Sequence, residues 1–225
     1  MTDSTPQPVV VNEAPLFGMP YMYRLVALFS LGWVVVYTDR TVLYPMLPLV
    51  GQEFQLTGAE MGAITSAYFL FYTAAQLISG MLGDRFGLKR LLVLFFFVAA
   101  LGIAAIGSLT ISYLTLIIFV ALHGAGAGGY YPLAYSLTIY TVPRWMRGLS
   151  SAIIGCGMSI GLVSGLALAG PLYHAEGNWR FPFLVLAVPT FFVASPMYGC
   201  SEIFDRRRLQ TLRSWPCSRI VTFCV

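Results

Sequence analysis

The residues best suited to bind an anion surround Arg40, in the segment Tyr-Thr-Asp-Arg-Thr at positions 37–41. A guanidinium group binds a carboxylate or a phosphate through two parallel hydrogen bonds. On a helix, Tyr37 and Tyr44 share the face of Arg40, whereas the adjacent Asp39 lies about 100° away. We predict that Arg40, Tyr37 and Tyr44 bind an anionic substrate and that Asp39 serves in packing or gating. The alternatives are that Arg40 pairs with a carboxylate elsewhere or extends outward to the membrane surface.

His123 is a further candidate for substrate binding, because histidine titrates near neutral pH and can carry a proton. It can equally form a hydrogen bond between helices. It precedes Gly124, Gly126 and Gly129, which spell G-x-G-x-x-G. We reject a dinucleotide site, since no strand precedes the glycines and they lie inside an apolar run. The glycines instead predict close helix packing.

The other reactive side chains predict neither an enzyme nor a cofactor. The two histidines stand at positions 123 and 174, and the four cysteines at positions 156, 200, 217 and 224. No two cysteines have the C-x-x-C spacing of a metal site, and no pair of nucleophile and base is evident. We therefore predict no catalytic residue, no metal ligand and no cofactor.

The composition predicts that membrane-spanning helices position these residues. Of the 225 residues, 58% are hydrophobic and 10% are charged, against about 25% charged residues in a typical soluble domain. A soluble domain of this size cannot bury so much apolar surface. The net charge of +4 is not read as a nucleic-acid signal, because the positions of the cations matter more than their sum. The predicted partner is the lipid bilayer.

Six apolar segments approach or exceed the length of about 20 residues that spans a bilayer. They are residues 23–50, 59–82, two helices between 90 and 144 with a turn near 107–112, residues 148–173 and residues 181–198. We therefore predict an all-α integral membrane protein, with a bundle of six transmembrane helices over residues 23–198. Tyr68, Tyr72 and Gln76 of the second helix are polar enough to line a cavity or to bond another helix.

The basic residues predict the orientation, because Lys and Arg in short loops favour the cytoplasmic side. With the N-terminus inside, Arg180 is external, Arg40 lies within a helix, and the remaining cations are cytoplasmic: Arg24, Arg85, Lys89, Arg90, Arg144, Arg147, Arg206, Arg207, Arg208, Arg213 and Arg219. We predict a multi-pass protein of the cell membrane with both termini cytoplasmic. Residues 1–22 form an N-terminal tail. Residues 199–225 form a second tail, which is a solvated linker, a truncated end or out-of-frame sequence.

The turn between the second and third predicted helices reads Gly-Met-Leu-Gly-Asp-Arg-Phe-Gly-Leu-Lys-Arg over residues 80–90. Gly80 lets another helix approach closely, and Asp84 can accept hydrogen bonds at a helix N-terminus. The cations can pair with carboxylates or anionic lipid headgroups. The alternative is that they only set the topology.

This turn resembles the signature loop of the major facilitator superfamily and lies where that family places it. Two further matches are Gly-Asn-Trp-Arg-Phe-Pro-Phe at 177–183 and Pro-Arg-Trp-Met-Arg-Gly at 143–148. The resemblance covers about residues 23–198, the N-terminal half of a family member. It implies half of a major facilitator fold, built as a 3+3 inverted repeat. It also implies a latch between the two halves, formed by Gly80, Asp84, Arg85, Gly87, Lys89 and Arg90. The Tyr-x-Asp-Arg element resembles the organic anion transporters of the superfamily.

The resemblance implies secondary active transport of a small solute by alternating access. The expected substrate is an organic anion, moved with a proton or another ion. Family members have about twelve helices around one site, whereas six are predicted here. The opposing wall is expected to come from a missing C-terminal half or from a second copy acting in a homodimer. The alternative is a truncated fragment that does not transport.

Overall fold

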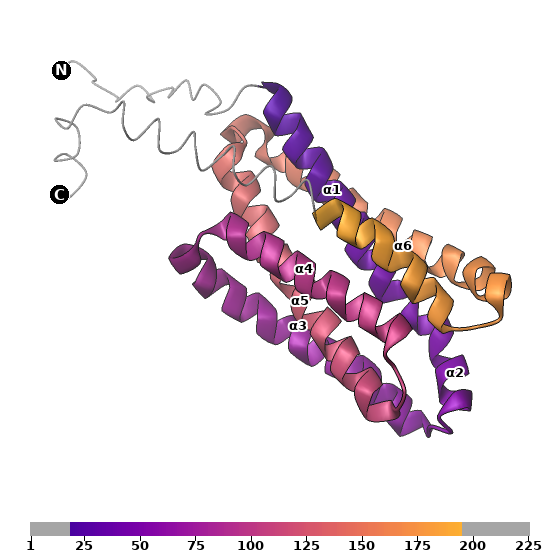
Figure 1. The fold of residues 1–225 in the computed structure, drawn as a ribbon. Helices are drawn as coiled ribbons and strands as arrows, with labels where there is room; N and C mark the ends of the chain where they lie inside the picture. Colours follow the sequence, from indigo (N-terminus) through magenta and orange to yellow (C-terminus); the bar gives the residue numbers. More distant parts are fainter. Residues whose placement is uncertain (1–18, 195–225) are drawn as a thin grey trace, which may run out of the picture.

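Helices make up most of the structure, a computed structural model that describes residues 19–194, with the side chains of 22–83 and 85–194. The elements in chain order are α1 (Met19–Thr41), α2 (Leu43–Glu53), α3 (Gly58–Phe86), α4 (Leu88–Ser108), α5 (Tyr113–Thr141), the 3-10 turn η1 (Arg144–Met146), α6 (Arg147–Glu176) and the last helix (Arg180–Ala194) (Figure 1). The predicted all-α bundle is confirmed.

Five segments of this bundle are long and apolar enough to cross a membrane. They are Met22–Glu53, Gly58–Gly83, Leu88–Ser108, Tyr113–Thr141 and Arg144–Glu176. The last helix, Arg180–Ala194, is apolar but shorter within the described residues. The predicted end of the sixth span, near residue 198, lies outside them, as do both predicted tails beyond residues 19 and 194.

The predicted first span over residues 23–50 is present as one span, Met22–Glu53, but the helix within it is interrupted at Val42, between α1 and α2. Pro45 lies in the first turn of α2 and has no backbone N–H to donate to the carbonyl of Thr41. The proline ring also crowds that carbonyl, which breaks the helix. The break falls directly after Arg40 and Thr41, so the predicted anion site lies at a bend of the chain.

The turn predicted near residues 107–112 is confirmed, since α4 ends at Ser108 and α5 begins at Tyr113. Ser112 caps α5: its side chain accepts a hydrogen bond from the backbone N–H of Thr115, and the Thr115 side chain bonds back. Thr57 and Glu60 form the same reciprocal cap at the start of α3. These caps satisfy N–H groups that a helix leaves unpaired at its start.

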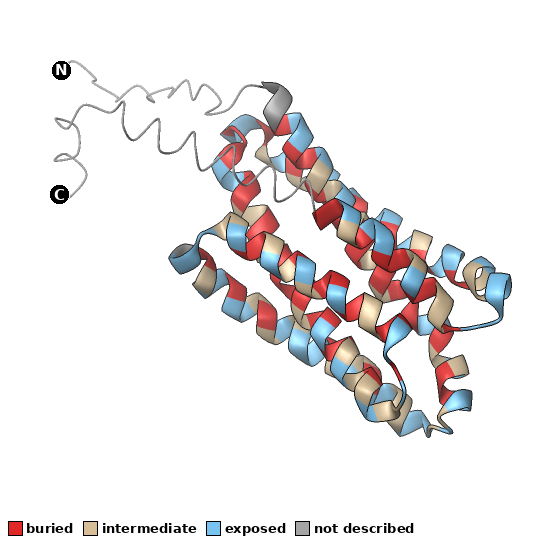
Figure 2. Ribbon diagram, in the orientation of Figure 1, coloured by how far each residue is buried: buried red, intermediate tan, exposed pale blue. Residues whose placement is uncertain are grey.

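Glycines bring the helices close together in two places. On α6, Gly157, Gly161 and Gly165 lie against α1, where an added Cβ would meet backbone or threonine atoms of α1. The hydroxyl of Thr38 donates to the carbonyl of Gly161 at 3.3 Å. On α5, the buried glycines face α3 and α4, so that α5 lies at the centre of this part of the bundle. Buried residues accordingly line the facing sides of the helices (Figure 2).

The bundle has two chemically different ends. The start of α1, the α3–α4 junction and η1 gather at one end, which we call the basic end (Figure 1). It holds Arg24, Arg85, Lys89, Arg144 and Arg147. The α2–α3, α4–α5 and α6–last helix connections lie at the opposite end. The clustering of cations at one end agrees with the predicted topology, although the side of the membrane that each end faces stays a prediction.

Candidate functional site

Arg40 lies in the last turn of α1, inside a group of aromatic rings that we call the Arg40 cage. Its Nε donates a hydrogen bond to the hydroxyl of Tyr44 at 3.3 Å. Its guanidinium carbon lies 4.6 Å from the ring centroid of Phe69, 5.2 Å from Tyr37, 5.6 Å from Tyr68 and 6.0 Å from Tyr72. Rings at such distances attract a cation through their negative faces. The structure thus brings Arg40, Tyr37 and Tyr44 together, as predicted.

The guanidinium has no carboxylate partner among the described side chains, and its one hydrogen bond goes to a neutral phenol. Aromatic faces hold the cation without occupying its outward N–H donors. Arg40 is neither fully buried nor exposed. Within the described residues Arg40 therefore makes no ion pair, and its terminal N–H groups suit a bidentate anion; a carboxylate partner elsewhere stays the alternative.

The cage is built by three helices, α1, α2 and α3. Tyr37 and Tyr44 come from the helices on either side of the break, and Tyr68, Phe69 and Tyr72 come from α3. The sequence indicated Tyr68 and Tyr72 as cavity-lining candidates but gave no reason to join them to Arg40. Phe69 was missed altogether, because a phenylalanine in an apolar run carries no signal that separates a binding residue from one facing lipid.

Asp39 points away from the cage, as its position on the helix predicts. It is 2% exposed, and its Oδ2 accepts a hydrogen bond at 2.7 Å from the hydroxyl of Thr190 on the last helix. Its other oxygen, Oδ1, has no hydrogen-bond partner among residues 19–194. An unpaired charge is costly in a membrane, so such a group is a candidate for function.

His123 packs against the Arg40 cage through the ring of Tyr68. Its ring lies 5.8 Å from the ring of Tyr68, and its Nδ1 lies 3.0 Å from the carbonyl oxygen of Ala99 on α4. A carbonyl only accepts, so Nδ1 carries the hydrogen, and in the neutral ring Nε2 is a buried acceptor with no partner in the part of the chain that the structure describes. The structure therefore shows the interhelical hydrogen bond that the sequence left open as an alternative.

The predicted latch residues lie at the α3–α4 junction of the basic end, far along α3 from the Arg40 cage. An added Cβ at Gly80 would meet no atom of the described chain within 4 Å, so this face has room for another helix. Gly87 has a φ of +89°, which favours glycine at this turn. Arg85 and Arg90 are exposed, whereas Lys89 is partly buried; the Asp84 side chain lies outside the described set.

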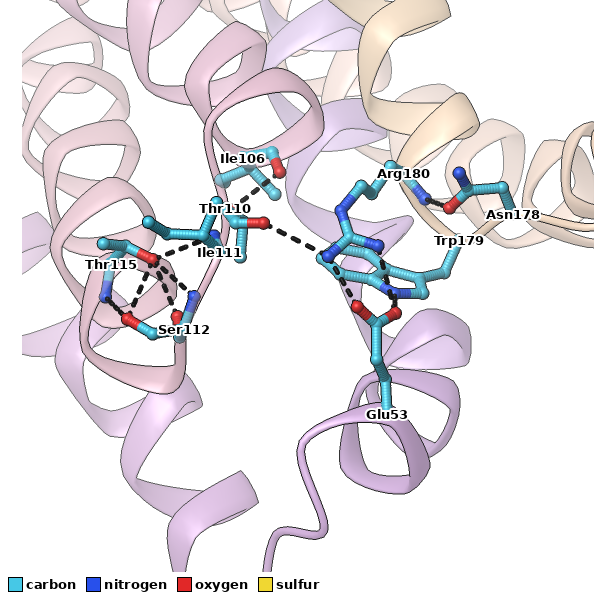
Figure 3. Close-up of polar contacts among 9 residues, drawn as sticks. All are labelled: Glu53, Ile106, Thr110, Ile111, Ser112, Thr115, Asn178, Trp179 and Arg180. Atoms are coloured by element: carbon cyan, nitrogen blue, oxygen red, sulfur yellow. Dashed lines mark hydrogen bonds and ion pairs between the residues drawn. The ribbon is translucent and has the colours of Figure 1, made fainter.

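A polar cluster lies at the end of the bundle opposite the basic end, and the sequence alone did not predict it (Figure 3). Arg180 donates from both terminal nitrogens to the two oxygens of Glu53, at 2.6 and 3.0 Å. Arg180 also donates to the carbonyl of Thr110 at 3.1 Å, and the indole N–H of Trp179 donates to Glu53. The cluster joins the end of α2, the α4–α5 turn and the start of the last helix, which are remote in sequence.

The long apolar helices, their glycine contacts and the cations gathered at one end are typical of a multi-pass membrane protein. Residues 29–207 match the Major Facilitator Superfamily, and the chain belongs to this family. The family resemblance drawn from the turn at residues 80–90 is thereby confirmed. Because family members are membrane transporters, the prediction that the protein is not an enzyme agrees with this placement.

Relatives and solved structures agree with this assignment. The chain is 27% identical over 167 residues to the probable sulfoacetate transporter SauU of Cupriavidus necator, which covers 73% of this chain and 38% of that protein. It is 27% identical to the probable anion transporter 6 (chloroplastic) of Arabidopsis thaliana, over 79% of this chain and 34% of that protein. The fold matches a bacterial homologue of the human lysosomal transporter Spinster with a TM-score of 0.74 and 21% identity, covering 82% of this chain and 44% of that chain. The chain thus spans less than half the length of these relatives.

Proposed function

We propose that the protein is the N-terminal half of a secondary active transporter for small organic anions, working by alternating access in the cell membrane. The observation that carries the proposal is the Arg40 cage: a guanidinium in a membrane span, held by aromatic rings and free of any described carboxylate. Such a cation binds a carboxylate or a sulfonate through paired hydrogen bonds. The names of the sulfoacetate and anion transporters among its relatives support the same substrate class.

We propose a proton as the coupling ion, with Asp39 as its carrier. Asp39 directly precedes Arg40 and lies about 100° away from it around the helix; it is buried, and one of its oxygens bonds Thr190 while the other has no partner among the described residues. Binding and loss of a proton therefore change the charge beside the anion site by one unit. His123 is the second candidate, because its Nε2 is buried and unpartnered.

The opposing wall of the site is proposed to come from a second six-helix bundle. Of the five long spans, those of α3 and α6 are the least buried: 17% and 28% of the residues in their most apolar 18-residue stretches are buried inside the bundle. Both helices expose large apolar side chains, such as Leu77 and Met81 on α3 and Val163 on α6. A C-terminal half or a second copy would cover them, with the turn at 80–90 as a latch and the basic end towards the cytoplasm.

The test is uptake by vesicles reconstituted with the full chain, under an imposed proton gradient. Short carboxylates and sulfonates are compared with neutral sugars, for the native chain and for Arg40→Ala, Arg40→Lys and Arg24→Ala. We expect a loss of about tenfold or more for both Arg40 variants, because a charge-assisted pair contributes about 1.5–3 kcal/mol and lysine lacks the planar fork. Arg24 is an exposed arginine of the same helix and serves as the matched control.

A second measurement separates binding from transport. Phenylglyoxal modifies arginines, and mass spectrometry of the Arg40 peptide reports whether a bound anion protects it. Protection without uptake would favour the fragment that lacks its opposing wall, and uptake by the chain alone would favour a homodimer. Uptake of anions that is unchanged in Arg40→Ala, together with no protection by any anion, contradicts the proposal. For coupling, Asp39→Asn is expected to abolish proton-driven accumulation while exchange of anions across the membrane persists.

A further inference from the structure

The position of α3 relative to Arg40 is not set by direct packing of α3 on α1. Among the described helices, α3 packs extensively on α5 and makes little contact with α1. Helix α5 is itself tied to α1 by the hydroxyl of Tyr130, which donates to the carbonyl of Phe29 at 2.6 Å. The distance from the Arg40 guanidinium to the rings of Tyr68 and Tyr72 therefore depends on how closely α3 packs against α5.

Two glycines of α5 determine this closeness. An added Cβ at Gly124 would lie 2.6 Å from the carbonyl oxygen of Tyr68, and one at Gly128 would overlap the carbonyl oxygen of Tyr72. Both contacts are with backbone atoms of α3, which cannot rotate away as a flexible side chain can. Any side chain at either position must push apart α5 and α3 at the very residues whose rings form the Arg40 cage.

We propose that Gly124 and Gly128 are positioning residues of the anion site, which hold Tyr68 and Tyr72 against the Arg40 guanidinium. Gly128 sets the contact at Tyr72, and Gly124 sets it at Tyr68, whose ring also lies against His123. The role in transport rests on the function proposed above, whereas the geometry of the cage does not.

The same helix provides a matched control. An added Cβ at Gly126 would overlap the backbone nitrogen of Ala99, so the packing conflict is as severe as at Gly128 but falls on α4, which contributes no ring to the cage. Gly126→Ala therefore reports the general cost of overpacking α5. Gly128→Ala and Gly124→Ala report that cost together with displacement of α3.

The experiment measures the rate at which phenylglyoxal modifies Arg40 in the full chain without any anion. Gly128→Ala and Gly124→Ala are expected to raise the rate about threefold or more, because withdrawal of one or two rings removes their attraction for the cation and exposes the guanidinium. Gly126→Ala is expected to leave the rate within twofold of the native chain. Phe69→Ala, which removes a ring outright, calibrates the response, and the Arg180 peptide serves as an internal reference.

Equal rates in Gly124→Ala, Gly128→Ala and the native chain, with a faster rate in Phe69→Ala, would overturn the proposal. If Gly128→Ala is not recovered as a monodisperse protein, Gly124→Ala, with its smaller overlap, decides the outcome alone. A weaker protection of Arg40 by a carboxylate probe in these variants, but not in Gly126→Ala, extends the positioning role to anion binding. If no anion protects even the native chain, the proposed function fails while the rates without anion still test the positioning role.

Discussion

The polar cluster of Glu53, Trp179 and Arg180 allows a quantitative prediction, because one carboxylate receives three donors from another part of the chain. The side chains of Arg180 and Glu53 are 25% and 40% exposed, so solvent weakens their attraction. An exposed pair contributes about 0.2–1 kcal/mol, and the bidentate geometry places this pair at the upper end of that range. We expect a coupling free energy of about 1 kcal/mol between the two side chains.

Arg180→Ala is expected to lower the free energy of unfolding by about 2 kcal/mol. Besides the ion pair, it removes the hydrogen bond to the carbonyl of Thr110 and the packing of the guanidinium on the Trp179 ring, 4.4 Å from its centroid. Glu53→Gln keeps one acceptor oxygen but removes the charge and replaces the other oxygen with an NH2 donor, so it is expected to lower the free energy of unfolding by about 1 kcal/mol.

A double-mutant cycle of Glu53→Gln and Arg180→Ala isolates the coupling, measured by unfolding of the full chain in mixed micelles with increasing SDS and followed by circular dichroism. Glu176→Gln with Arg180→Ala is the matched control, because Glu176 is an exposed carboxylate near the same end without an ion pair to Arg180. The coupling is expected to fall with added salt, since the pair is partly exposed. A Glu53–Arg180 coupling below about 0.3 kcal/mol, no larger than the deviation from additivity of independent sites, would refute the reasoning.

Substitutions at Gly165, Gly170 and Thr57 test the helix contacts and one helix cap by the same unfolding measurement. Gly165→Ala is expected to cost about 1–3 kcal/mol, because its Cβ would overlap Thr41 of α1. Gly170→Ala on the same helix meets no atom within 4 Å and is expected to change the free energy of unfolding by less than about 1 kcal/mol, because the gain in helix propensity is offset by crowding against Pro171. Equal effects would contradict the packing of α6 on α1. Thr57→Ala is expected to cost about 1 kcal/mol through loss of the α3 cap, and Thr57→Ser to restore most of it; a neutral Thr57→Ala would show that the cap contributes nothing.

Much of the fold could be predicted because the bilayer restricts what a chain can do. Within hydrocarbon every backbone polar group must find an internal partner, so a long apolar run forms a helix whatever its neighbours are. The runs at 59–82 and 148–173 accordingly reappear as α3 and α6 with longer ends. Gly157, Gly161 and Gly165 lie four residues apart on one face of α6, a spacing typical of a close helix contact, but only the structure shows that α1 is the partner.

The break at Val42 shows a limit of that reasoning. Hydropathy continues through residues 22–53, and the whole segment counts as one span. The break is decided by Pro45, whose missing N–H and crowded ring act on one turn only. The proline was visible in the sequence, but tertiary contacts, such as those of Thr38 and Thr41 with α6, decide where the bend is held.

The sequence by itself determined which residue carries the candidate chemistry and on which face of its helix it lies, because spacing along one helix fixes direction. Arg40, Tyr37 and Tyr44 follow from that local geometry alone. Only the tertiary structure decided what surrounds Arg40, since Phe69 and the rings of α3 reach it through the packing of α3 on α5. Likewise, the pairing of Glu53 with Arg180 joins positions 127 residues apart. The helix face on which a side chain lies depends only on spacing along the chain, whereas the distance between residues on different helices depends on how all the helices pack together.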